Sequence, residues 1–276
     1  MTFASSDMDW LAEMLAETAR TEIMPRFRRL GDGDIRQKTS AADLVTEADV
    51  NAERVITAAL RERYPQARII GEEAVSDDPA LLDADWSSAD LAFTIDPVDG
   101  TFNFASGVAC FGVMLAVVSK GETVAGIIHD PVGGDWVMAE KGAGAVLRAS
   151  DGRESALEVA APVAVDQMIG SVSWQFMPEP ERSMLARNQA RCLGGVAYRC
   201  AAQEYRLLAS GHIHFALYRK LMPWDHLPGV LIQEEAGGHV RRFDGSAYRP
   251  NHTEGGVLVA SDPDSWQRIR DALWHA

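Results

Sequence analysis

The chain has 276 residues, of which 47% are hydrophobic and 24% charged, an ordinary composition for a folded protein with one large core or two linked cores. Its 26 Lys and Arg residues against 40 Asp and Glu residues give a formal net charge of -14. This acidity argues against binding to a nucleic-acid polymer or an anionic membrane surface, because both need clustered basic side chains. The excess carboxylates are either solvated surface charge or, in part, ligands for hard divalent cations.

The three cysteines, Cys110, Cys192 and Cys200, lie in apolar stretches without a C-x-x-C pair, which favours a reducing compartment over a disulfide framework. Asp7 and Asp9 take the place of a basic region near the amino terminus, so we expect no signal peptide. Apolar runs stay well below the ~20 residues needed to cross a bilayer. We therefore expect a cytoplasmic protein without a membrane span.

The first half of the chain predicts helices followed by strands. A polar, glycine-rich link over residues 31–38 and a polar surface connection over residues 76–90 separate the periodic segments. Ser6 is expected to cap the first helix. The expected elements are helices over residues 6–24 and 46–64, strands over 68–70 and 91–95, and an antiparallel strand meander over 111–147.

The second half alternates strands and helices. Its expected elements are strands over residues 168–172, 212–217, around 240 and over 257–260, and helices over 179–190, 201–209, 225–236 and from 262 onward. The change of pattern predicts two sub-domains packed as one body, an α+β unit over residues 1–150 and an α/β unit over residues 151–276.

The segment DPVDGT, residues 96–101, is the most informative stretch. An expected strand delivers two carboxylates, Asp96 and Asp99, three residues apart, and Pro97 stiffens the link between them. These carboxylates and the Val98 carbonyl oxygen could point into one small volume. Peptide N–H groups at residues 100 and 101 would then be available to a phosphate at the start of a helix. A metal site beside an anion site is the layout that phosphoryl chemistry needs.

Each feature also has a structural explanation. A D-P-x-D-G sequence is a common turn, and Glu72 with Glu73 after Gly71 can be a solvated acidic loop. Thr46 and Asp49 match a helix capping pair, and Asp225 can cap a helix. An EF-hand is excluded, because position twelve counted from Asp96 is Gly107.

Taken together, the sequence resembles the inositol monophosphatase-like family of magnesium-dependent, lithium-sensitive phosphatases. The resemblance rests on four blocks in order, from residue 38 to residue 238: Lys38 followed by DLVTEAD (43–49), GEE (71–73), DPVDGTFNF (96–104), and PWDHLPG (223–229) with EEAGG (234–238). It implies a layered α/β or α+β sandwich of alternating helix and sheet layers, of the sugar-phosphatase type, with the site between the two sub-domains. It also implies a homodimer and a small phosphorylated metabolite as the partner.

The resemblance also implies roles for individual residues. Two or three Mg²⁺ ions are expected on the metal ligands Glu72, Asp96, Asp99, Asp225 and the Val98 carbonyl, most of them in residues 1–150. The catalytic residues are Asp49, Thr101 and Glu72, of which Asp49 and Thr101 orient or deprotonate the attacking water. The amides of Gly100 and Thr101 hold the phosphate, and Cys200, Ala201, Tyr218 and Asp225 contact the substrate. Metal ions fit this chemistry, because they shield the anionic ester and lower the pKa of bound water.

The sequence departs from the family pattern where the alcohol is recognised. Arg199-Cys200-Ala201-Ala202 stands where relatives often have G-[ST]-A-A, and Tyr218 replaces a glutamate that contacts inositol hydroxyls. Arg219 and Lys220 follow, and they either favour a second anionic group on the substrate or form an ordinary exposed basic pair.

We therefore expect hydrolysis of a small phosphate monoester by metal-activated water, with inositol-1-phosphate as the default substrate. Histidinol phosphate, a 3′(2′),5′-bisphosphate nucleotide and fructose-1,6-bisphosphate are the alternatives. Outside this class, a non-catalytic scaffold that binds metal or phosphate would have lost a ligand or the water-orienting pair, and the sequence keeps both.

Overall fold

The computed structural model describes residues 3–31, 33–40, 43–82 and 85–274. The α-helices are α1 (Asp7–Thr18), α2 (Glu47–Arg63), α3 (Glu72–Asp77), α4 (Thr101–Ala105), α5 (Glu181–Asn188), α6 (Ala201–Ala209), α7 (Pro223–Glu235) and α8 (Pro263–Trp274). The strands are β1 (Ile35–Ser40), β2 (Asp43–Thr46), β3 (Arg68–Gly71), β4 (Ala92–Asp99), β5 (Gly112–Ser119), β6 (Glu122–Asp130), β7 (Asp135–Glu140), β8 (Gly144–Arg148), β9 (Glu154–Ala156), β10 (Ile169–Val172), β11 (Gly194–Val196), β12 (Phe215–Tyr218), β13 (His239–Arg242) and β14 (Val257–Ala260).

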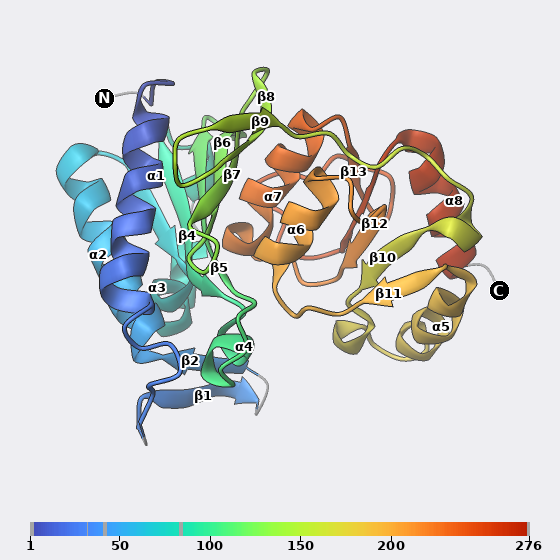
Figure 1. Ribbon diagram of the computed structural model, residues 1–276, viewed down its shortest axis with the longest axis horizontal. Coiled ribbons are helices and arrows are strands. Elements are labelled where there is room, and N and C mark those ends of the chain that lie inside the picture. The colour runs from blue at the N-terminus through green and yellow to red at the C-terminus, as the bar shows by residue number, and fades with distance from the viewer. Residues whose placement is uncertain (1–2, 32, 41–42, 83–84, 275–276) are drawn as a thin grey trace.

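Helices and sheets stack in alternating layers, as Figure 1 shows. Helices α1 and α2 cover the outer face of a seven-stranded sheet in the order β3-β4-β5-β6-β7-β8-β9. Helices α6 and α7 lie between that sheet and a five-stranded sheet in the order β11-β10-β12-β14-β13, whose far face carries α5 and α8. The expected layered sandwich is therefore confirmed.

The two sheets differ in strand direction. In the larger sheet only β3 and β4 run parallel, and every later pair is antiparallel, as expected for a meander. In the smaller sheet β10 pairs in parallel with β11 and β12, whereas β14 pairs antiparallel with β12 and β13. The parallel pairs are joined through helices, as such crossovers require.

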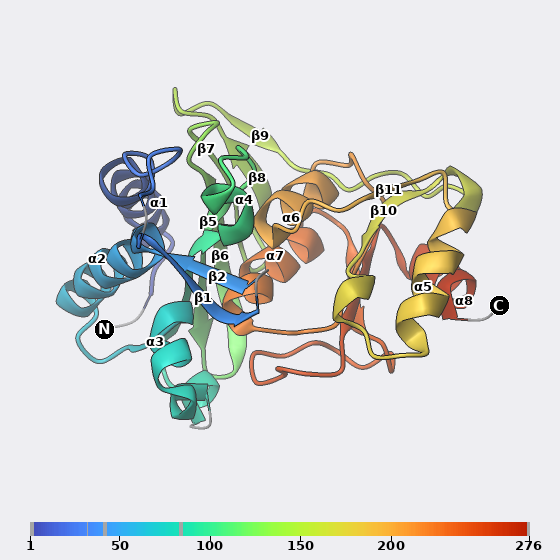
Figure 2. The same ribbon diagram turned by 90° about the horizontal axis from the view of Figure 1, so that it is seen from below.

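Several predicted elements end at other residues than expected. Ser6 makes no side-chain cap, and α1 passes into a π-helical turn, Ala19–Ile23. The link over residues 31–38 contributes to a hairpin of β1 and β2, which is also visible in Figure 2. The strand expected over 91–95 continues to Asp99, and the strand expected from 212 begins at Phe215. The connection over 76–90 buries Trp86, so it is not purely a surface segment.

The middle helical layer packs tightly on the seven-stranded sheet. A Cβ added at Gly126 of β6 would lie 2.7 Å from the Pro228 carbonyl oxygen of α7, so only glycine permits this approach. A Cβ at Gly229 would meet the Tyr205 ring of α6 at 2.2 Å. One hydrophobic cluster accordingly contains residues from both halves of the chain. The boundary between sub-domains at residue 150 stays a prediction.

Among the described residues, no helix has the length and apolar character that crossing a membrane would need.

We predict that Gly126→Ala lowers the free energy of unfolding by ~1–3 kcal/mol, because the new methyl group forces α7 away from β6. Urea denaturation measures the change. Gly194→Ala is the matched control, since its Cβ would find its nearest neighbour, Ile169 Cγ1, at 3.8 Å and should change stability by less than ~0.5 kcal/mol. Equal effects of the two substitutions would contradict the packing argument.

Candidate functional site

The site is built around an irregular end of β4. Opposite β5 the register shifts between Asp96 and Asp99, so one extra residue bulges out of the strand where Pro97 cannot donate a ladder hydrogen bond. Gly100 follows with φ 89°, and a Cβ there would lie 2.9 Å from the Cys110 carbonyl oxygen. Glycine is therefore required both by the left-handed backbone and by the close approach. Helix α4 begins directly afterward, at Thr101.

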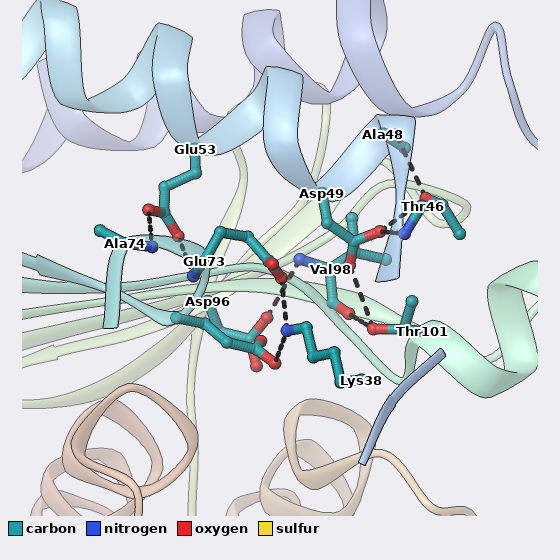
Figure 3. Close-up of polar contacts among 11 residues, drawn as sticks. Lys38, Thr46, Ala48, Asp49, Glu53, Glu73, Ala74, Asp96, Val98 and Thr101 are labelled. Carbon is teal, nitrogen blue, oxygen red and sulfur yellow. Dashed lines mark hydrogen bonds and ion pairs between the residues drawn. The ribbon is translucent and has the colours of Figure 1, made fainter. Parts of the chain in front are cut away.

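Asp49 and Thr101 are connected by a hydrogen bond. Asp49 completes a capping box at the start of α2, where its Oδ2 accepts from the Thr46 N–H at 2.8 Å and from the Thr46 hydroxyl at 2.5 Å. Its Oδ1 lies 3.1 Å from Thr101 Oγ1, which is also 3.0 Å from the Val98 carbonyl oxygen. Figure 3 shows Asp49 reaching from α2 toward Thr101. Capping therefore holds Asp49 in place while its second oxygen faces the site.

An ammonium group bridges two carboxylates next to this pair. Lys38, from β1, places Nζ 2.8 Å from Glu72 Oε1 and 2.7 Å from Glu73 Oε1 at the start of α3. Figure 3 shows Lys38 reaching toward Glu73. Glu53, one helical turn after Asp49, accepts the N–H groups of Glu73 at 2.7 Å and Ala74 at 2.8 Å. Its carboxylate thereby fixes the turn that carries the two glutamates.

Asp225 supplies a carboxylate from the C-terminal half of the chain. It lies in the first turn of α7, which begins at Pro223, and its carboxyl group is near that of Asp96. Burial raises the pKa of both Asp96 and Asp225 well above the usual range, and the nearby charge of Glu72 raises it further.

Asp99 is positioned by the start of α6. Its Oδ2 accepts the Ala202 N–H at 2.5 Å and the Cys200 thiol at 3.0 Å. Burial raises the pKa of Asp99 to about 6, while these hydrogen bonds partly oppose the rise. The same α6 interaction joins the two halves of the chain at the site.

The site has more negative charge than its nearest cation compensates. Burial raises the pKa of Asp49 to about 7 and that of Glu73 to about 8, with the charge of Glu72 adding to both. Burial alone would lower the pKa of Lys38, but Glu72 and Glu73 raise it above its usual value. In the described part of the chain, no three His, Cys, Asp or Glu side chains already surround one point as metal ligands would.

A cavity of about 480 Å³ opens beside these groups. Of the residues predicted for the site, those that line it are Glu72, Asp99, Gly100, Thr101, Cys200, Ala201, Tyr218 and Asp225. Asp49, Asp96 and Val98 are almost fully buried behind them. The structure thus brings every predicted site residue to one place, from seven elements and the two segments that follow β4 and precede α6.

Several residues of the site were not predicted for it. Glu53 could have been found, because it lies four residues after Asp49 on the same face of α2. Lys38 and Glu73 were noted only as parts of sequence blocks, and the pairing of β1 with β2 that brings Lys38 here has a weak sequence signal. Glu204, which lines the cavity and whose pKa burial raises to about 7, lies 105 residues beyond Asp99 and carries no motif.

Comparison with known proteins identifies the chain. The model of the inositol monophosphatase family matches residues 5–276. The chain belongs to the inositol monophosphatase family. Membership makes it a phosphoric monoester hydrolase, and the prediction of an enzyme of this class is confirmed.

Relatives match over nearly the whole chain. The inositol-1-monophosphatase of Caulobacter vibrioides is 30% identical over 266 residues, which cover 94% of this chain and 99% of that protein. The Nus factor SuhB of Pseudomonas aeruginosa is 31% identical over 265 residues, covering 94% of this chain and 93% of the relative. The structure of an inositol monophosphatase from Zymomonas mobilis superposes with a TM-score of 0.80 at 25% identity, covering 98% of this chain and 99% of the other.

We predict that Asp96→Asn stabilises the protein in the presence of a chelator at pH 8, by ~1–3 kcal/mol, because Asn has the same shape and is neutral without taking up a proton, whereas the buried Asp96 carboxyl must bind one on folding. The raised pKa means that folded Asp96 holds its proton where the unfolded chain has lost it. Its contribution to stability is therefore intact near pH 4 and is lost as the pH rises.

Urea denaturation at several pH values measures this difference. The gain from Asp96→Asn should vanish near pH 4. Asp90→Asn is the control, because the Asp90 side chain is 93% exposed and should show no such pH-dependent gain. A destabilised Asp96→Asn at pH 8 would contradict the excess of buried charge.

Proposed function

We propose that the protein hydrolyses a small phosphate monoester with the help of Mg²⁺, and that inositol-1-phosphate is its default substrate. The observation that carries the proposal is the convergence of buried and half-buried carboxylates from α2, α3, β4 and α7 beside a cavity large enough for a sugar-sized ester. A solvated acidic surface would not place Asp96 at 2% exposure.

The donor set fits magnesium. Glu72, Asp96, Asp99, Asp225 and the Val98 carbonyl would hold two or three ions, and all of these ligands are the hard oxygen donors that Mg²⁺ prefers. The proximity of Asp96 and Asp225 also fits, since a bound cation would offset the repulsion between their charges. Bound Mg²⁺ supplies charge neutralisation for the ester and a lowered pKa for water.

The chain's own residues orient the reaction. Asp49 is fixed by its capping box, and its Oδ1 lies 3.1 Å from the Thr101 hydroxyl. Thr101 takes a proton from the attacking water and passes its own hydroxyl proton to Asp49. Glu72 lies at the start of α3, on the turn that Glu53 fixes, and is the third catalytic residue of the proposal. The peptide N–H groups of Gly100 and Thr101 bind phosphate oxygens where the left-handed glycine turns the backbone.

Other residues that line the cavity would select the alcohol. They include Cys200, Ala201 and Tyr218, together with the basic Arg219 and Lys220. The Tyr218 hydroxyl is buried and faces Glu204, but it forms no hydrogen bond of normal geometry with the described residues. A substrate hydroxyl would satisfy it.

The basic side chains that line the cavity favour a second candidate function, in which the substrate carries a second anionic group. Arg199, held in a left-handed backbone conformation with φ 53°, lies over the Phe102 ring at 3.9 Å and joins Arg219 and Lys220 in lining the cavity. Fructose-1,6-bisphosphate and a 3′(2′),5′-bisphosphate nucleotide carry such a group. Histidinol phosphate is the remaining alternative.

Other properties are proposed from the family resemblance: a homodimer, lithium inhibition and a cytoplasmic location. We propose a small metabolite rather than a nucleic-acid polymer as partner, although several relatives are named Nus factor SuhB, because the net charge of -14 opposes a broad contact with phosphate backbones. A non-catalytic scaffold that binds metal or phosphate is the outcome if no ester is hydrolysed.

We predict that Asp99→Asn lowers magnesium-dependent kcat/KM by at least ~100-fold, because it removes a ligand charge from the site. Phosphate release is measured with inositol-1-phosphate, histidinol phosphate, fructose-1,6-bisphosphate and a bisphosphate nucleotide. Asp90→Asn should match the wild type. Near-wild-type turnover by Asp99→Asn, or wild-type turnover in EDTA, would reject the mechanism.

We predict that Tyr218→Phe raises KM about 3–10-fold with little change in kcat, because the substrate loses one hydrogen bond. Stability should not fall, since the hydroxyl has no partner of normal geometry among the described residues. Tyr205→Phe is the control: it removes a hydroxyl 3.1 Å from His226 Nδ1 and should cost ~1 kcal/mol of stability without changing KM. Unchanged KM in Tyr218→Phe would remove Tyr218 from the substrate wall.

A further inference from the structure

Two cysteine thiols lie next to each other beside the Asp99 carboxylate. Cys200, 2% exposed, immediately precedes α6 and donates its thiol hydrogen to Asp99 Oδ2 at 3.0 Å. Cys110 lies in the segment between α4 and β5, ninety residues earlier in the chain, and packs against the hydrophobic cluster that contains Cys200, with the two thiols next to each other. The pair thus links the N-terminal sheet to the start of α6.

Gly100 is the reason that the two cysteines can approach. A Cβ built on Gly100 would lie 2.9 Å from the Cys110 carbonyl oxygen, 3.2 Å from Cys200 Cβ and 3.3 Å from Cys200 Sγ. Both cysteines therefore pack against the same small residue. The Asn103 side chain donates to the Cys110 carbonyl at 2.8 Å, which holds this segment in place.

The two thiols differ in access to solvent. Cys110 is partly exposed and follows Val108, which is 50% exposed, whereas Cys200 is buried. Cys110 is therefore the thiol that a peroxide reaches first, whereas the Cys200 thiol is buried and donates its hydrogen to Asp99. When a partly exposed thiol lies next to a buried one, the sulfenic acid formed on the first can react with the second to give a disulfide.

We propose that Cys110 and Cys200 form a reversible disulfide when a peroxide oxidises the protein, and that this bond lowers phosphatase activity by removing the thiol donor from Asp99. The loss of activity rests on the proposed function, but the disulfide does not.

The chemistry balances with one peroxide. The Cys110 sulfur attacks hydrogen peroxide and becomes a sulfenic acid, and one water is released. The Cys200 sulfur then attacks the Cys110 sulfur; the S–O bond breaks, the S–S bond forms, and the departing oxygen takes the Cys200 proton to leave as a second water. Two thiols are oxidised by two electrons in total, and a dithiol reductant reverses the reaction.

The disulfide has a direct consequence for Asp99. Cys200 no longer carries a hydrogen, so Asp99 Oδ2 loses one of its hydrogen-bond donors while the Ala202 N–H remains. A carboxylate with fewer fixed donors is less well oriented. Cys200 is therefore a positioning residue, and Cys200→Ser, whose hydroxyl can donate to Asp99, should retain more activity than Cys200→Ala.

The test treats reduced full-length protein with hydrogen peroxide and follows two readouts. Mass spectrometry after thiol blocking and proteolysis detects a crosslinked peptide pair containing Cys110 and Cys200. Magnesium-dependent phosphate release measures activity before oxidation, after it, and after dithiothreitol. The wild type should form the crosslink, lose at least ~10-fold in kcat/KM, and recover with dithiothreitol.

Two variants separate this switch from general oxidative damage. Cys110→Ser should keep the basal activity, form no crosslink, and lose activity at least ~10-fold more slowly than the wild type. Cys192→Ser should behave as the wild type, because Cys192 packs in another hydrophobic cluster, with Trp266 and Leu273.

Three results would overturn the proposal: no Cys110–Cys200 crosslink in the wild type, full activity in the crosslinked protein, or equally fast inactivation of Cys110→Ser. A crosslink in a protein that hydrolyses none of the substrates when reduced would reject the proposed function while supporting the disulfide.

Discussion

The structure depends on a cluster of buried and half-buried carboxylates beside the Lys38 ammonium group. Glu72 and Glu73 share this ammonium group, while burial and the charge of Glu72 raise the pKa of Asp96 and Asp225. Such an arrangement costs free energy in the folded protein unless positive charge enters from outside. Part of the net charge of -14 therefore lies at this one site, where divalent cations would offset it.

The layered architecture places these charges. The bulge at the end of β4 and the left-handed Gly100 allow Asp96 and Asp99 to face different neighbours, one toward α7 and the other toward α6. Helices α6 and α7 belong to the C-terminal half but pack on the N-terminal sheet. The site is therefore complete only when this part of the core is packed. Binding and stability are expected to be linked at this layer.

Much of the fold and site was predictable from the sequence, for identifiable reasons. The strand meander, α6 and β14 follow from local periodicity and turn residues. The DPVDGT segment carries five site residues at once, and the PWD segment carries Asp225. Lys38 and Glu204 were not assigned roles, because their places depend on the β1–β2 pairing and on packing across the cavity. The contact between Cys110 and Cys200 depends on tertiary structure alone, since no spacing rule joins residues ninety apart.

The most direct test of this account is the melting temperature of the wild-type protein at pH 8, measured against magnesium concentration at constant ionic strength. If the buried carboxylates need a cation, the melting temperature should rise steadily with magnesium, by about 5 °C or more once the concentration reaches ~100 times the dissociation constant. Sodium at matched ionic strength should not reproduce the rise. A melting temperature unchanged at every magnesium concentration would contradict the claim that the site is built to hold divalent cations.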